Sequence, residues 1–237
     1  MNLTWLSKEE INEVVNQKFI QTNILLDIGS GICPQSFVKP EVHICVEPYL
    51  PYIEKLQQEG VNEGKYVFLN CTWEVAMKLL PDNSVDSVFA IDSIEHLEKE
   101  DGLKFLKEAE RVARQQVVIY TPLGFYPQSY EDPNKADRWE MGGGFWQTHR
   151  SGWHPEDFGE NWELIGCQEY HFFDENDQPL EKPFGVIWAF HNLGKPPQRT
   201  RQRFSFEAVA TDELALELWK RTTRKVKQIL IPFKAKR

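Results

Sequence analysis

Five short apolar runs alternate with segments of helical periodicity, and this alternation restricts the possible folds more than any other feature of the sequence. The apolar runs lie at 24–29, 42–47, 65–70, 88–92 and 115–122. Helices are expected at 7–19, 52–60, 73–80 and 99–113, the first of them with a capping box formed by Ser7 and Glu10. Repeated strand–helix units favour an open, mostly parallel α/β sheet.

The part of the chain after residue 122 has a different texture. Residues 123–155 are rich in Gly, Pro, Trp, Tyr and His, and a loop of this length in a compact domain is usually a lid or a binding loop. Two apolar segments at 162–174 and 183–192 then read as antiparallel strands. We therefore expect a doubly wound, mostly parallel sheet of seven strands with an antiparallel C-terminal edge hairpin.

Composition and charge divide the chain into two parts. Its 237 residues, 41% hydrophobic, suffice for one sizeable domain, which we place at residues 1–194. Residues 195–237 hold twelve Lys/Arg and four Asp/Glu, a net charge of +8, and are expected to form a linker and an amphipathic helix at about 211–230. Residues 1–194 carry a net charge of −17, compared with −9 for the whole chain, and this acidic charge counts against nucleic acid as their ligand.

Several features bear on the compartment. No apolar run reaches the ~18 residues of a membrane span, and the N-terminal segment lacks the pattern of a secretory signal. The four cysteines, Cys33, Cys45, Cys71 and Cys167, show no C-x-x-C spacing. We therefore expect small buried thiols, no disulfide, no bound metal and a cytoplasmic location.

The segment ILLDIGSGICP at 24–34 places a glycine loop at the end of the first strand, where open α/β sheets bind ligands. A dinucleotide fingerprint would need glycine at position 34, where Pro34 removes an N–H that could face a pyrophosphate. Two acids, Asp27 and Glu47, fit instead a cationic adenosine cofactor. Glu47 could accept both ribose hydroxyls, and Asp27 could receive the amino-acid group directly or through water. The loop Gly29-Ser30-Gly31 would let the backbone approach this ligand.

Here the chain resembles the class I S-adenosylmethionine-dependent methyltransferases, over about residues 24–125. Four segments carry the resemblance, namely ILLDIGSGI, ICVEP, LNCTWE and LPDNSVDSVFAIDSIEHL. The family's glycine loop often has a third glycine, and this chain has Cys33 in that place. The resemblance implies S-adenosylmethionine as the methyl donor, with S-adenosylhomocysteine as the product. It also implies that Asn70, Cys71 and Thr72 lie beside the adenine and that Asp92 and Ser93 lie near the methionine end.

Methyl transfer to a hydroxyl requires a group that accepts the proton, and histidine has a suitable pKa. The candidates are His96 after the fourth strand and His149 and His154 in the lid. His96 could instead pack in the first turn of a helix, and His154 could cap the helix that follows it. The run HRSGWHP at 149–155 resembles one found in sugar- and polysaccharide-linked methyltransferases.

These observations predict O-methylation of a sugar, glycan or other small polar acceptor. Two alternatives stay open, a catalytically silent cofactor-binding or scaffold subunit and a nucleic acid methyltransferase. The acidic body and the absence of an N-P-P-Y motif after the fourth strand count against the latter. The basic C-terminal helix is expected to pack on its own body or in a homodimer, or to contact a membrane peripherally.

Overall fold

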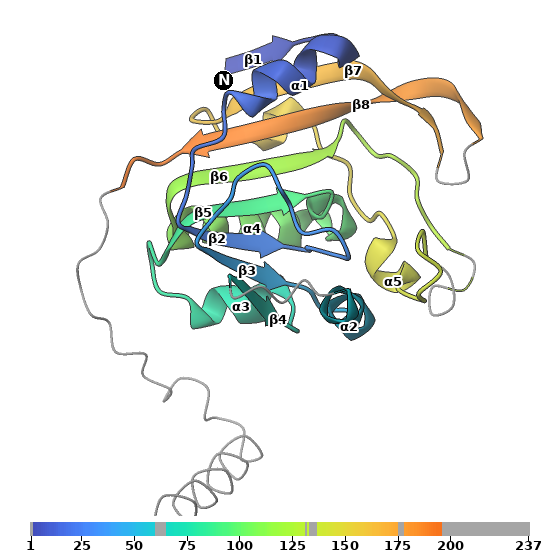
Figure 1. Ribbon diagram of the computed structural model, residues 1–237. Helices are drawn as coiled ribbons and strands as arrows, with labels where there is room; N and C mark the ends of the chain where they lie inside the picture. Colours follow the sequence, from blue (N-terminus) through green and yellow to red (C-terminus); the bar gives the residue numbers. More distant parts are fainter. Residues whose placement is uncertain (1, 60–64, 131, 133–136, 175–177, 196–237) are drawn as a thin grey trace, which may run out of the picture. The chain divides into compact units, whose positions relative to one another are not determined.

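The computed structural model describes residues 2–59, 65–130, 132, 137–174 and 178–195, and within them one mixed sheet of eight strands (Figure 1). The strands are β1 Asn2–Trp5, β2 Ile24–Ile28, β3 Val42–Val46, β4 Tyr66–Leu69, β5 Val85–Ile91, β6 Ala113–Pro122, β7 Glu163–Phe173 and β8 Pro179–Asn192. The helices are α1 Lys8–Asn16, α2 Leu50–Gln58, α3 Trp73–Leu79, α4 Lys99–Val112 and α5 Gly144–Gln147, with 3-10 turns at Ile94–His96 and Pro155–Asp157. The expected basic linker beyond Lys195 and its helix lie outside the described residues.

The strand order is β1-β7-β8-β6-β5-β2-β3-β4. Strands β2 to β6 run parallel, whereas β8 pairs antiparallel with both β6 and β7. The chain passes from β2 outward to β4, then returns to place β5 on the other side of β2. This reversal puts a topological switch point at the carboxyl ends of β2 and β5, which is where open α/β sheets bind ligands. The doubly wound sheet and its antiparallel edge are thus confirmed.

One strand was missed in the sequence. Asn2–Trp5 forms β1 and pairs parallel with Glu163–Gly166 of β7, so the sheet has one strand more than the seven expected. Four residues are too few to show strand periodicity, and three of the four are exposed. The Trp5 ring lies so close to Gly166 that a Cβ there would come within 2.3 Å of it. Gly166 therefore leaves the space that the Trp5 ring fills.

The two faces of the sheet are covered by separate apolar clusters. Leu26 and Val88 pack with α3 and α4, whereas their neighbours Leu25 and Phe89 pack with α1. Side chains of a strand alternate between faces, which explains why a central strand buried on both sides reads as a continuous apolar run. Helix α1 begins at the predicted capping box, in which the Glu10 carboxylate accepts from the Ser7 N–H. Among the described helices, none is long and apolar enough to cross a bilayer.

The predicted lid segment is fixed to the body at its C-terminal end. The Trp153 side chain is fully buried against α4, and the Lys99 ammonium lies 3.9 Å from its ring centroid. Lys99 Nζ also donates to the Gly152 carbonyl at 2.7 Å and to the Asp157 carboxylate at 2.6 Å. Helix α4 comes this close to the indole because it has glycine at position 102, where a Cβ would lie 2.4 Å from Trp153 Cζ2.

We expect Gly102→Ala to lower the free energy of unfolding by about 1–2 kcal/mol. Overpacking a core costs about 1–3 kcal/mol, which the better helix propensity of alanine offsets by at most about 1 kcal/mol. Urea unfolding followed by circular dichroism measures the change. Gly159→Ala is the matched control, because its Cβ would meet Trp162 at an ordinary 3.6 Å. Equal stability of the two variants would contradict the tight contact between Trp153 and α4.

Candidate active site

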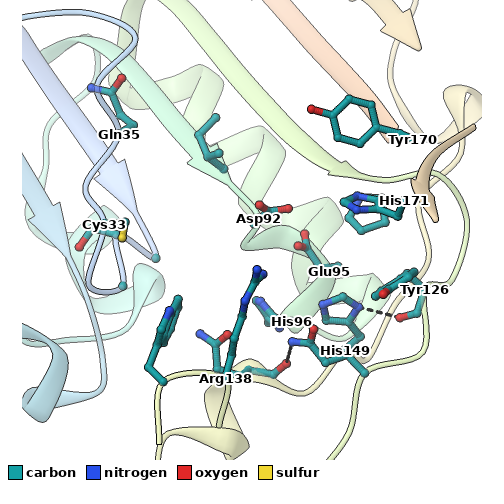
Figure 2. Close-up of a pocket in the computed structure, with 18 of the residues that line it drawn as sticks. Cys33, Gln35, Asp92, Glu95, His96, Tyr126, Arg138, His149, Tyr170 and His171 are labelled. Carbon is teal, nitrogen blue, oxygen red and sulfur yellow. Dashed lines mark hydrogen bonds between the residues drawn. The ribbon is translucent and has the colours of Figure 1, made fainter. Parts of the chain in front are cut away.

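Two adjoining cavities lie at the carboxyl edge of the sheet. The larger, about 620 Å³, is bounded by the loop after β2, the segment after β5, the lid and the β7–β8 hairpin (Figure 2). The smaller, about 270 Å³, is bounded by the ends of β3 and β5 and the start of α3. Gly29, Asp92, His96 and Gln147 line both cavities. The two spaces therefore meet at the switch point and can hold one elongated ligand together with a second one.

The predicted glycine loop forms the wall between β2 and β5. Gly29 and Gly31 have φ angles of 69° and 53°, in the left-handed region that favours glycine. A Cβ at Gly29 would lie 2.7 Å from the Ser93 Cβ, so this glycine also permits the close approach of the segment after β5. The side chain of Cys33, in the place of the third glycine, is exposed.

Glu47 follows β3 and is only 4% exposed. Its Oε2 accepts from the Gly31 N–H at 2.9 Å, and its Oε1 accepts from the Tyr49 N–H at 2.8 Å. Burial raises the pKa of this carboxyl to about 7. Because a carboxylate has about four lone-pair positions, two of them remain for ligand hydroxyls.

Asp27 is buried below the same loop. Its Oδ2 accepts from the Gln35 N–H at 3.0 Å and lies 2.9 Å from His43 Nε2. Asp27 also lines the larger cavity, so the carboxylate holds the turn after the glycine loop and borders the predicted ligand space. The neighbouring Ser30 hydroxyl is buried without a hydrogen-bond partner among the described residues.

The remaining predicted cofactor residues divide into two groups. Thr72, Asp92 and Ser93 line the smaller cavity. Asn70, which follows β4, instead connects to the end of β3, since its Nδ2 donates to the Glu47 and Pro48 carbonyls at 2.9 Å. Neither Asn70 nor Cys71 is among the described residues that line the two cavities.

Asp92 lies where the two cavities meet. Its φ of 48° is unusual for a residue other than glycine. The residue is exposed to solvent at the cavity wall. Partial desolvation by the surrounding protein raises the pKa of its carboxyl to about 7, although the nearby Arg138 favours the charged form. Backbone strain of this kind is often found at functional sites.

Two of the three predicted histidines come together. The rings of His96 and His149 lie 4.8 Å apart, and both line the larger cavity. Nδ1 of His96 lies 3.2 Å from the Thr148 carbonyl and Nδ1 of His149 lies 2.6 Å from the Tyr126 carbonyl. Because a carbonyl only accepts, each Nδ1 carries the proton and each neutral ring has its lone pair on Nε2. Burial lowers both pKa values, that of His96 to about 3.

His154 is exposed and does not line either cavity in the described part of the chain. Its N–H donates to the Asp157 carboxylate at 2.7 Å, at the start of the 3-10 turn Pro155–Asp157.

Residues 26–121 match the family model described as a methyltransferase domain. This part of the chain is a methyltransferase domain of the class I, S-adenosylmethionine-dependent type. The match begins within β2, includes β3, β4 and β5, and ends near the end of β6, just before the lid.

Solved structures resemble the methyltransferase in fold. An S-adenosylmethionine-dependent methyltransferase from Leishmania major is 12% identical, with a TM-score of 0.50, and the likeness covers 76% of this chain and 69% of that one. A further methyltransferase, from Archaeoglobus fulgidus, is 19% identical over 77% of this chain and 92% of that one, with a TM-score of 0.46. No curated protein matches the chain.

The methyltransferase contains functional candidates that the sequence did not single out. Glu95 is buried beside His96, its Oε2 accepts from the Thr121 hydroxyl at 3.0 Å, and burial raises its pKa well above the ordinary value. Asp137 in the lid accepts hydrogen bonds from Tyr52 and three backbone N–H groups. Glu95 had a signal in the pair Glu95-His96 after β5, whereas nothing in the sequence links Asp137 to Tyr52.

The site of the methyltransferase fits its cofactor. Left-handed glycines bring the backbone loop against Ser93, and the buried Glu47 retains lone pairs at the edge of the smaller cavity. The unpartnered Ser30 hydroxyl and the Gln35 side-chain amide, whose Nε2 also lacks a partner among the described residues, both line the larger cavity. Polar groups of this kind can satisfy the amino-acid end of a ligand.

Proposed function

We propose that the methyltransferase O-methylates a sugar, glycan or other small polar acceptor bound in the larger cavity. The observation that supports this proposal is the mixed lining of that cavity. Aromatic side chains of Tyr126, Tyr170 and Phe172 share it with the polar side chains of Gln128 and His171. Flat apolar faces beside hydrogen-bonding groups suit a sugar ring, which has apolar faces and a polar rim.

The cofactor is proposed to lie across both cavities. S-adenosylmethionine supplies, when bound, an electrophilic methyl group on a sulfonium. Glu47 would hold the ribose hydroxyls, Thr72 would border the adenine, and Gly29 and Asp92 would border the methionine end. Asp27 would keep the loop after Gly31 in place and face the amino-acid group.

The acceptor proton has three possible destinations where the cavities meet. We assign it to the Asp92 carboxylate, because this side chain borders both cavities and has a pKa of about 7, whereas that of His96, which also borders both, is about 3. The Nε2 atoms of His96 and His149 are the alternatives retained from the sequence prediction. His154 would serve only if the lid moved it from its exposed position. Four free cysteines suit a reducing compartment, and we propose that the reaction takes place in the cytoplasm.

The test is methyl transfer to a panel of monosaccharides, oligosaccharides and other polyols, with S-adenosylhomocysteine formation as the readout and NMR to locate the methyl group. A methyl ether is the expected product. Methylation of amines, nucleic acid or carbon alone would overturn the proposal. Asp92→Asn is expected to reduce kcat at least about 100-fold, within the range of general-base contributions, with cofactor affinity measured separately. An equal loss in His149→Gln with Asp92→Asn active would move the proton acceptor to the histidine.

Cofactor affinity is expected to rise with pH through about 7. Ribose hydroxyls donate to a carboxylate, so binding favours ionised Glu47, whose pKa in the free protein is about 7. Below this pH the affinity should fall by up to about tenfold per pH unit. The folding stability of the free protein should change with pH in the opposite direction. The folded form holds the Glu47 proton more tightly than the unfolded form, so the free energy of unfolding falls as the pH rises from about 4.5 to about 7. Calorimetric titration with S-adenosylhomocysteine from about pH 5.5 to about pH 8.5 measures the effect.

Glu47→Gln is the control for this pH profile, because glutamine has the same shape and does not titrate. Its affinity should stay constant over the same window. A wild-type profile as flat as that of Glu47→Gln would contradict the role given to Glu47.

A further inference from the structure

We propose that Glu95, His96 and His149 form a binding site for a divalent first-row transition-metal ion in the floor of the larger cavity. One ligand atom from each of the three residues lies within 4.8 Å of the others. Figure 2 shows the Glu95 carboxylate between Asp92 and the two imidazoles. A metal ion about 2.1 Å from each ligand atom needs neighbouring ligand atoms about 3–3.5 Å apart, so small side-chain rotations would complete the site.

The ring orientation of both histidines supports this assignment. Metal-bound histidines almost always donate their second N–H to a carbonyl or a carboxylate, which fixes the tautomer and directs the other nitrogen to the ion. Nδ1 of His96 and Nδ1 of His149 donate to the carbonyls of Thr148 and Tyr126. The Glu95 carboxylate is fixed in the same way by the Thr121 hydroxyl at 3.0 Å. Each proposed ligand therefore has an outer partner.

The two chain segments that carry the ligands are held together by their backbones. The N–H groups of Arg150 and Ser151 donate to the Glu95 carbonyl at 2.8 and 3.1 Å. The Arg150 guanidinium donates to the His96 carbonyl at 2.8 Å. These hydrogen bonds hold the run HRSGWHP against the segment after β5. They bring His149 next to the Glu95-His96 pair, which lies far earlier in the chain. This juxtaposition is invisible in the sequence, which led us to expect no metal.

The donor set determines the class of ion. Two imidazoles and one carboxylate suit Zn²⁺, Fe²⁺, Co²⁺ or Mn²⁺, whereas Mg²⁺ and Ca²⁺ prefer oxygen ligands. The carboxylates of Glu95 and Asp92 favour a cation, and Arg138 near Asp92 opposes it. Three protein ligands leave positions open toward the cavity. Granted the proposed function, an acceptor hydroxyl would occupy one of them and lose its proton to Asp92 more readily.

The described residues contain a second cluster, Asp27, His43 and Cys45. All three side chains are buried, and the Asp27 carboxylate already accepts from the Gln35 N–H and lies 2.9 Å from His43 Nε2. This cluster is occupied by its own hydrogen bonds, and we propose no ion there. It must nevertheless be distinguished in the test, because it contains a thiol.

The experiment is titration of the full-length chain, purified without a polyhistidine tag and treated with a chelator, with Co²⁺ followed by visible absorption and with Zn²⁺ followed by calorimetry. We expect one equivalent of each ion to bind. His96→Gln and His149→Gln should each weaken binding at least about tenfold, because loss of even an outer-shell partner costs 10–100-fold. His154→Gln is the matched control and should bind as the wild type does.

Three outcomes would overturn the site. These are no binding to the wild type, binding unchanged in both histidine variants, or binding lost in Cys45→Ser together with a thiolate charge-transfer band. X-ray absorption of the Zn²⁺-loaded wild type decides the case if the variants fail to fold: nitrogen and oxygen ligands support the site, and sulfur contradicts it. Affinity for S-adenosylhomocysteine is measured on the same samples. A failed metal site with intact cofactor binding would leave the proposed function standing, and the reverse result would separate them equally clearly.

Discussion

Glu47→Ala is expected to weaken the binding of S-adenosylmethionine and S-adenosylhomocysteine by about 10- to 150-fold. Hydrogen bonds to a charged group contribute about 1.5–3 kcal/mol, and 1.4 kcal/mol corresponds to tenfold in affinity. The loss has a second component, because Glu47 also accepts from the Gly31 and Tyr49 N–H groups. Truncation would therefore leave the glycine loop less ordered before the ligand arrives.

Calorimetry with both ligands measures this effect, and two further variants serve as controls. Glu47→Gln keeps one oxygen acceptor and the side-chain volume, so its affinity should lie between those of wild type and alanine. Glu54→Ala removes the same charge from an exposed position on α2 that does not line either cavity within the described residues. An affinity unchanged in Glu47→Ala would remove Glu47 from the cofactor site, whatever the result of the acceptor screen.

Asp137→Ala is expected to release the part of the lid that covers the glycine loop. The Asp137 carboxylate is 7% exposed and accepts from Tyr52 Oη at 2.7 Å and from the N–H groups of Trp139, Met141 and Gly143 at 2.9, 2.8 and 2.6 Å. Although its partial burial opposes ionisation, these hydrogen bonds hold its pKa below the ordinary value. Hydrogen bonds to a charged group contribute about 1.5–3 kcal/mol each, and Asp137→Ala removes four of them.

The consequence of this release should reach the cofactor. A Cβ at Gly31 would lie 3.5 Å from the Trp139 ring, so the segment that Asp137 holds rests on the glycine loop. We expect faster hydrogen exchange over residues 137–149 in Asp137→Ala and weaker binding of S-adenosylhomocysteine, with smaller changes in the core strands. Asp82→Ala is the control, because it removes an exposed carboxylate that is paired with Arg111 and that lines neither cavity within the described residues. Unchanged exchange over the lid would show that Asp137 does not hold it.

The parallel half of the fold could be predicted from the sequence because each of its signals is local. Runs such as Ile24–Ile28 are mostly apolar since both faces of a central strand are buried, and helices between the strands, such as α2 and α4, have apolar residues at helical spacing. The strand order places Gly29, Asp92 and Glu47 at the carboxyl edge of the sheet. Each of them directly follows a strand, so the end of each predicted strand indicates its position. β1 escaped because its pairing partner lies far along the chain and its four residues carry no periodic pattern.

The acceptor side of the site could be predicted less well, because it is built from long-range contacts. Tyr52 on α2 donates to Asp137 in the lid, although the two residues are far apart in the sequence. Glu95 and His149 are likewise distant in the sequence and close in space. Such pairs have no spacing rule, since the intervening loop and not a helix or strand period sets their distance. The glycine run at 142–144 was visible, but its reason was not: a Cβ at Gly143 would come within 2.1 Å of Tyr52 Oη.

The pairing of β1 with β7 has a consequence for the order in which the protein assembles. β1 precedes its partner segment Glu163–Gly166 by most of the described chain, so β1 is synthesised early and can pair only after that segment has been made. Until then, the backbone groups along that side of β7 remain open to any extended segment nearby, including the same segment of a neighbouring nascent chain. Bulky fusions at the N-terminus would prolong this interval, and exchange of β1 between two copies is the form of misassembly that the topology makes easiest.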